Sequence, residues 1–125
     1  MDPAPALLLD KPAAKAAYEK LFTFLLTLGP FSVEEKKTSL HLVAGGAAFL
    51  GVHPRRNGLR INIVLSRPLD TAVRSERVSA RRVHNEFDFS VDEDVSEELA
   101  SWLREAYELK LSSSPTNVEA SQESL

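Results

Sequence analysis

The 125-residue sequence predicts an α+β domain in which two helices pack on one face of a four-stranded antiparallel sheet. Three observations favour this fold class. Apolar residues recur at helical spacing near both ends of the chain, they alternate with polar residues in between, and short turn signals separate the alternating segments. A chain of this length normally forms one domain, which buries roughly 65 to 70% of the surface that the unfolded chain exposes. We expect a flexible N-terminus at residues 1–11, a single domain at residues 12–111 and a disordered acidic tail at residues 112–125.

The first helix is predicted to begin at Pro12, because proline is favoured in the first turn of a helix. From Ala14 to Leu28, apolar residues follow the three- and four-residue spacing of one helical face. Gly29 and Pro30 come next, and a glycine followed by a proline ends a helix.

Four segments show the alternation of a half-buried strand, at residues 38–43, 47–53, 59–65 and 82–91. Between the second and third segments, Asn57 and Gly58 predict a tight hairpin turn, because this pair readily adopts the positive φ that two-residue turns require. Residues 69–81 show no sustained period, so we expect a long arginine-rich connection there.

The second helix is predicted to begin at Asp94 or at Ser96. Asp94 with Glu97 three positions later resembles a capping box, whereas Ser96 offers an alternative N-cap. Leu99 and Trp102 begin an apolar helical face, which we expect to dock on the sheet.

The formal net charge of −3 hides a strong asymmetry along the chain. Residues 53–84 contain eight arginines and two acids, a formal charge of +6, whereas residues 85–125 contain two bases and eleven acids, a formal charge of −9. The basic segment has no lysine, and the planar arginine fork holds phosphate or carboxylate through two parallel hydrogen bonds. This segment therefore predicts contact with an anion, with the alternative that its arginines pair with the acids of the C-terminal third.

The composition excludes several classes of chemistry. Without cysteine there is no disulfide, no thiolate metal site, no iron–sulfur cluster and no thiol nucleophile. The first residues lack the positive charge and the apolar length of an export signal. The longest nearly uncharged stretch, residues 21–33, is shorter than the about 20 apolar residues of a membrane span. We expect a cytoplasmic protein that does not enter a membrane.

The strand alternation places polar side chains together on the sheet face away from the core, where neighbouring strands bring them within about 5 Å of one another. An imidazole oriented by a carboxylate, beside an arginine, would form a binding surface there. With the arginines of the turns included, the candidate binding residues are His41, Arg55, Arg56, Arg60, Asn62, Arg81, Arg82, His84 and Glu86. The alternative is a solvated sheet face on which Arg60 and Glu86 form a surface ion pair.

The sequence shows no catalytic motif. The serines lie outside a Gly-x-Ser-x-Gly elbow, and Gly45 and Gly46 lack the Gly-Lys-Ser/Thr ending of a phosphate loop. His41, His53 and His84 do not have the spacing of a metal-binding motif. We expect no catalytic residue, no metal and no cofactor.

Three hypotheses follow for the function. The first is a non-enzymatic binding module that engages an anionic partner, either nucleic acid or an acidic protein surface, through the arginine-rich connection and the polar sheet face. The second is a small-molecule pocket or weak enzyme built on His41, Arg60, His84 and Glu86. The third is a homodimer formed through the polar face or an edge strand.

Several stretches of the chain carry a family resemblance, at residues 18–22, 28–30, 49, 58–60, 83–84, 94–99 and 102–108. In these stretches the chain resembles a family of small bacterial domains without established activity, domain of unknown function 5655. None of the stretches is a catalytic motif. Members resemble stand-alone domains or appendages of larger proteins, which implies an accessory role.

Overall fold

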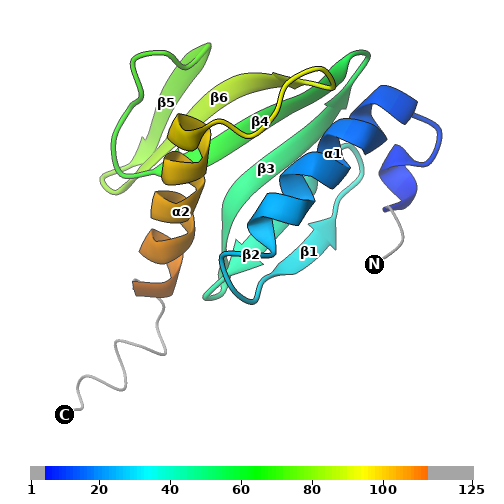
Figure 1. Ribbon diagram of the computed structural model, residues 1–125. Coiled ribbons are helices and arrows are strands. Elements are labelled where there is room, and N and C mark those ends of the chain that lie inside the picture. The colour runs from blue at the N-terminus through cyan, green and yellow to red at the C-terminus, as the bar shows by residue number, and fades with distance from the viewer. Residues whose placement is uncertain (1–4, 113–125) are drawn as a thin grey trace.

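The computed structural model describes residues 5–112, which form a sheet layer and a helical layer (Figure 1). The helices are η1 (Ala6–Leu8, a 3-10 helix), α1 (Pro12–Leu25) and α2 (Glu97–Ser112); the strands are β1 (Ser32–Glu35), β2 (Leu40–Ala44), β3 (Ala47–Arg55), β4 (Gly58–Leu65), β5 (Arg74–Ser79) and β6 (Arg82–Ser90). The strands lie in the order β1-β2-β3-β4-β6-β5, and all neighbours are antiparallel. The predicted α+β class with two helices and an antiparallel sheet is confirmed.

The prediction of four strands is wrong, because the sheet has two further strands at its edges. Every residue of β1 and of β5 is exposed. A strand without a buried face need not alternate apolar with polar residues, so the period-two signal is missing. Residues 69–81, expected to be an irregular connection, therefore contain β5, which pairs with β6 and not with the preceding β4.

The helix arrangement also differs from the prediction. The additional helix η1 precedes α1, and its Leu8 is fully buried in the core. Helix α1 packs on β3, β4 and β6, whereas α2 packs on β2, β3 and β4. The helical layer is therefore built from three segments, of which α1 and α2 cover different sets of strands.

Helix α2 begins directly after Ser96, the second of the two predicted N-caps. The Oγ of Ser96 accepts a hydrogen bond from the backbone N–H of Leu99 at 3.0 Å, as an N-cap serine does. Asp94 lies outside the helix and pairs with Lys20 of α1 at 3.3 Å. The predicted tail at residues 112–125 lies outside the described residues except for Ser112, which ends α2.

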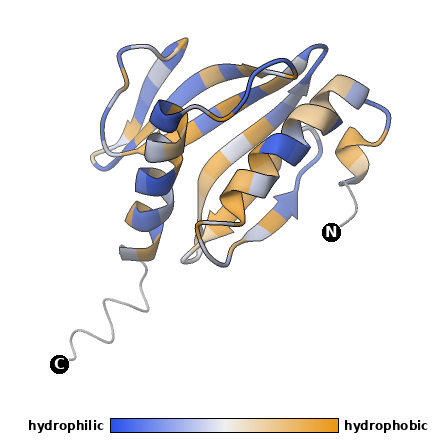
Figure 2. Ribbon diagram, viewed as in Figure 1, coloured by the Kyte–Doolittle hydropathy of each residue, from blue (hydrophilic) through white to orange (hydrophobic). Residues whose placement is uncertain are grey.

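The register between β4 and β6 determines which side chains of the two strands lie on each face of the sheet. Leu59 lies opposite Phe89 and Ile61 opposite Phe87, and these residues belong to the core or pack against it. The residues between them point to the other side of the sheet, which we call the outer face. Figure 2 shows this alternation of apolar and polar residues along the strands.

Aromatic rings connect the helices to the sheet through the centre of the core. Their centroids lie 5.4 to 6.1 Å apart in the pairs Tyr18–Phe22, Phe22–Phe31, Phe31–Phe49 and Phe49–Tyr107. The Tyr107 hydroxyl also donates a hydrogen bond of 2.7 Å to the carbonyl of Pro30. This contact fixes α2 to the segment that follows α1.

One polar side chain, Asn85 of β6, is fully buried on the core side of the sheet. Its Oδ1 accepts hydrogen bonds from the N–H of Leu69 at 2.8 Å and from the hydroxyl of Ser75 at 2.6 Å. Its Nδ2 donates to the carbonyl of Arg67 at 3.1 Å. Asn85 therefore holds the connection between β4 and β5 against the sheet.

Replacing this residue in Asn85→Ala should lower the free energy of unfolding by about 1 to 3 kcal/mol, because the buried N–H of Leu69 is left without an acceptor. Urea denaturation measures the loss. Ser75→Ala is the matched control, since it removes one bond to Asn85 but leaves no buried donor, and it should cost less than about 1 kcal/mol. Equal losses in the two variants would contradict the anchoring role of Asn85.

Candidate anion-binding site

The outer face carries most of the polar residues that the sequence singles out. Arg60, Asn62 and Val64 of β4 lie opposite Asp88, Glu86 and His84 of β6 in the register. On the other side of β4, His53 lies opposite Arg60, and His41 lies opposite Gly51, which is the partner of Asn62. The structure therefore places His41, Arg60, Asn62, His84 and Glu86 on one sheet face.

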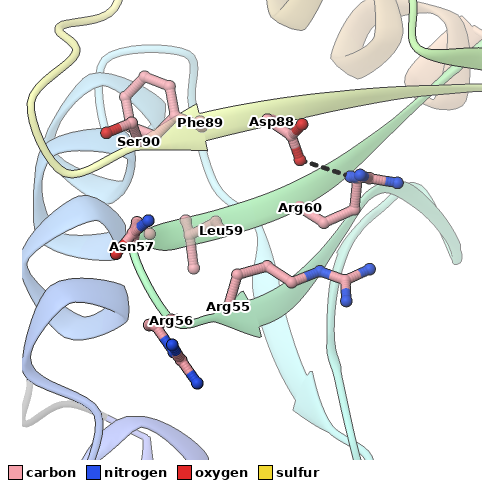
Figure 3. Close-up of a pocket in the computed structure, with 9 residues that line it drawn as sticks. Arg55, Arg56, Asn57, Leu59, Arg60, Asp88, Phe89 and Ser90 are labelled. Carbon is pink, nitrogen blue, oxygen red and sulfur yellow. Dashed lines mark hydrogen bonds and ion pairs between the residues drawn. The ribbon is translucent and has the colours of Figure 1, made fainter.

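Arg60 is held by two carboxylates within the fold. Its Nη1 donates to Oε1 of Glu86 at 3.0 Å. Its Nε donates to Oδ1 of Asp88 at 2.7 Å, the contact drawn in Figure 3. The hydrogen bond to Asp88 is the main reason why the pKa of Arg60 is raised. Since both carboxylates belong to β6, the guanidinium joins two strands and is not free for an external anion.

Two histidines of the outer face resist protonation. Burial is the main cause that lowers the pKa of His53, with the charge of Arg55 second. Burial also lowers the pKa of His84, and the charge of Arg82 contributes. Within residues 5–112, Nε2 of His84 and Oδ1 of Asn62 are buried without a hydrogen-bond partner.

Four of the eight arginines in residues 53–84 interact with other groups in the fold. Besides Arg60, Arg67 bonds Glu105 of α2 through two nitrogens at 2.9 and 3.2 Å, and Arg74 lies 3.4 Å from Glu76. Arg77 donates to the carbonyl of Ala80 at 2.9 Å. Pairing with acids of the C-terminal third, the alternative that the charge asymmetry left open, therefore applies to Arg60 and Arg67, and to Arg74 through Glu86 at 4.0 Å.

The other four are Arg55, Arg56, Arg81 and Arg82, whose side chains form no hydrogen bond or ion pair within the part of the chain that the structure describes. They form two pairs, one at the turn between β3 and β4 and one at the turn between β5 and β6. The eight residues of β4 separate these turns by about 26 Å at the usual rise of a strand. The available arginines therefore do not form one patch.

The pocket at the β3–β4 turn has a volume of about 470 Å³ and is lined by Arg55, Arg56 and Arg60 together with Asp88. Arg55 and Arg56 extend in different directions from the turn (Figure 3). Arg60 is bonded to Asp88. Because its cations diverge and one is neutralised, this pocket has little capacity to hold an anion.

A second pocket forms where β3 and β4 separate. Where β3 pairs with β2, a β-bulge makes Phe49 an extra residue of β3. On its other side, the pairing of β3 with β4 ends at Leu50, which lies opposite Ile63. Beyond this point Ala47 of β3 and Val64 and Leu65 of β4 line a pocket of about 640 Å³. We call it the basic pocket, and its complete lining is Gly45, Gly46, Ala47, Val64, Leu65, Ser66, Arg81, Arg82, Leu109, Lys110 and Ser112.

Three cationic side chains border the basic pocket, and none of the described residues that line it carries a carboxylate. Arg81 and Arg82 come from the β5–β6 turn, and Lys110 comes from the last turns of α2. Burial lowers the pKa of Lys110, and the charge of Arg82 lowers it further. Two like charges are therefore held close together in a partly apolar setting, which an anion would stabilise.

The sequence predicts Arg81 and Arg82 as binding residues but not Lys110 or the apolar lining. Lys110 carries no signal of its own, because a cation in the last turn of a helix is explained by the helix dipole. Val64 and Leu109 are ordinary apolar residues of a strand and a helix. Only the docking of α2 across β2, β3 and β4 brings these residues to the arginine pair.

Residues 5–112 show neither a metal site nor a membrane-spanning helix. No helix within this range is both long and apolar enough to cross a membrane. No group of three or more His, Asp and Glu side chains in the same range could hold a metal ion. The histidines of the outer face are thus not arranged for coordination.

These features define an antiparallel α+β domain with a basic pocket at one end of its sheet. The chain belongs to the family described as Domain of unknown function (DUF5655), whose model matches residues 6–110. The match runs from η1 almost to the end of α2, so it covers every described element. No curated protein and no solved structure matches the chain. The family resemblance predicted from the sequence is confirmed.

His53 and His84 should make stability depend on pH. In the folded protein the pKa of each histidine is lowered from its ordinary value of 6.5. Between pH 6.5 and the lowered pKa, the unfolded chain therefore binds more protons than the folded protein. The stability that depends on neutral imidazoles is thus complete above pH 6.5 and is lost as the pH falls through the lowered values. For the wild-type protein, the urea concentration at the midpoint of unfolding should be lower at about pH 5.5 than at about pH 7.5. The difference between the two pH values should be smaller in His53→Gln/His84→Gln. Identical pH profiles for the two proteins would refute this assignment.

Proposed function

We propose that this domain is a binding module for an anionic partner, which it engages at the basic pocket. The observation that carries the proposal is the convergence of Arg81, Arg82 and Lys110 on one pocket without a carboxylate in its described lining. In an ordinary structural role such cations are paired or point separately into solvent, as the other arginines do.

The outer face is a less favourable surface for an anion than the basic pocket. Apart from Arg55 and Arg82, which belong to the two arginine pairs at its ends, it carries by register two arginines and four acids, which are Arg60, Arg74, Glu34, Glu76, Glu86 and Asp88. A polyanion that ran along this face between the two arginine pairs would approach more negative than positive charge. We therefore assign the contact to the end of the arginine-rich segment and not to the polar face.

The two other hypotheses have less support. A small-molecule site or weak enzyme built on His41, Arg60, His84 and Glu86 would need these side chains to face a common ligand, but Arg60 and Glu86 bond each other. A homodimer through an edge strand stays a prediction for β1 and β5, the two edges of the sheet.

Pyrophosphate is a suitable first probe, because it is a compact anion whose charge complements the three cations that line the pocket. We expect it to shift the backbone amide resonances of Gly45, Gly46 and Ser66 in a two-dimensional NMR titration of the full chain. In Arg81→Gln/Arg82→Gln its affinity should fall at least about tenfold, since hydrogen bonds to charged groups contribute about 1.5 to 3 kcal/mol each.

Arg55→Gln/Arg56→Gln is the matched control, since it removes the same two charges from exposed, unpaired arginines at the other end of β4. Its affinity for pyrophosphate should stay within about twofold of the wild-type value, apart from the general effect of net charge. Equal loss in the two double variants, or resonance shifts confined to the β3–β4 turn, would overturn the assignment to the basic pocket.

A further inference from the structure

We infer that the natural ligand of the basic pocket is a small organic phosphate with an apolar body. This inference rests on the proposed function and adds the chemical class of the ligand. It depends on three features of the described residues: the size of the pocket, its apolar lining and the charge of the surface around it.

The size of the pocket suits a small molecule. Its volume of about 640 Å³ lies within the roughly 300 to 1,000 Å³ that is typical of small-molecule sites. Four separate parts of the chain surround it: the β2–β3 turn, the end of β4, the β5–β6 turn and the end of α2. A bare phosphate ion would leave most of this space to water.

The lining between the cations is apolar. Ala47, Val64, Leu65 and Leu109 supply it. Val64 and Leu65 are already buried within the fold, whereas Ala47 and Leu109 are half-buried and leave apolar surface accessible. An apolar group of a ligand would cover this accessible surface of Ala47 and Leu109.

The cations of the pocket suit a phosphate dianion. Two guanidinium groups offer planar forks for phosphate oxygens, and the ammonium group of Lys110 adds a third positive charge. Burial lowers the pKa of Lys110 and the charge of Arg82 lowers it further, so a dianion beside both cations would relieve their repulsion. A monoanionic carboxylate would compensate less of the charge.

The surroundings of the pocket disfavour a polymer. His84, the cross-strand partner of Val64, is opposite Glu76 of β5, and Glu86 follows two residues later on the same face. A nucleic acid strand that left the pocket over the outer face would approach these carboxylates. The positive charge is thus concentrated at one position, as a single phosphate group requires.

Phenyl phosphate and inorganic phosphate, compared at an alkaline pH at which both are dianions, form a matched pair of probes that differ mainly in the apolar ring. We expect phenyl phosphate to bind the full-length protein at least about tenfold more tightly in the NMR titration, because its ring would cover apolar surface of the pocket. Benzoate, which keeps the ring but has one negative charge, should bind more weakly than phenyl phosphate. A single-stranded oligonucleotide should gain no affinity per phosphate over phenyl phosphate.

Ala47→Ser tests the apolar lining, since it adds a hydroxyl group to a half-buried side chain of the pocket. The variant should lower the affinity ratio of phenyl phosphate to inorganic phosphate at least about threefold and leave the affinity for inorganic phosphate unchanged. Ala48→Ser is its control, because Ala48 is a half-buried residue of the same strand outside the pocket lining. The wild-type ratio tests the inference even if a variant does not fold.

The outcomes separate this inference from the proposed function. If phosphate and phenyl phosphate bind the pocket equally, the organic ligand is refuted while the anion site stands. Tighter binding of the oligonucleotide per phosphate also refutes the small ligand and favours nucleic acid. If pyrophosphate, phosphate and phenyl phosphate all bind without dependence on Arg81 and Arg82, both the function and the ligand class are refuted.

Discussion

The register between β4 and β6 is the constraint on which the rest of this domain depends. Because side chains alternate along a strand, the pairing of Ile61 with Phe87 buries one set of residues under the helices and turns the other set outward. A slip of one residue would expose Ile61 and Ile63 and bury Arg60. The same register sets the end of β4 beside the start of β6, and so places Val64 and Leu65 near Arg82.

The basic pocket arises from an interruption of this otherwise regular sheet. The bulge at Phe49 lets that side chain join the aromatic contacts of the core, and β3 then leaves β4. Helix α2 closes part of the opening: a Cβ at Gly45 would lie only 2.6 Å from the carbonyl oxygen of Lys110. Glycine with a positive φ of 62° is therefore required where the β2–β3 turn meets the helix end. The β2–β3 turn thus contacts the end of α2 and also lines the basic pocket.

Charge pairing divides the arginines into two groups with different roles. Arg60 and Arg67 connect elements, since they bridge β4 to β6 and the β4–β5 connection to α2. Arg81 and Arg82 lie beside Lys110 without such compensation. The arginines are exposed, but Lys110 is half-buried, so the nearby charge of Arg82 disfavours its charged form. Such local electrostatic costs are characteristic of functional sites. The proposed binding function follows from this difference and not from the total number of arginines.

The sequence by itself determined the α+β class, the elements with one buried face, the presence of a hairpin between β3 and β4, and the family, because these follow from local periodicity, turn chemistry and short motifs. The two turn residues of that hairpin are Arg56 and Asn57 and not the predicted Asn57 and Gly58, and the predicted positive φ occurs at Gly58 alone. It also identified Arg81 and Arg82 as candidates. Only the tertiary structure revealed the edge strands β1 and β5, whose exposed residues show no alternation. The partners of Arg60 and Arg67, and the approach of Lys110 to the arginine pair, likewise depended on long-range packing. Convergence of side chains from distant segments has no local sequence signal, because it depends on where a bulge separates two strands and where a helix docks.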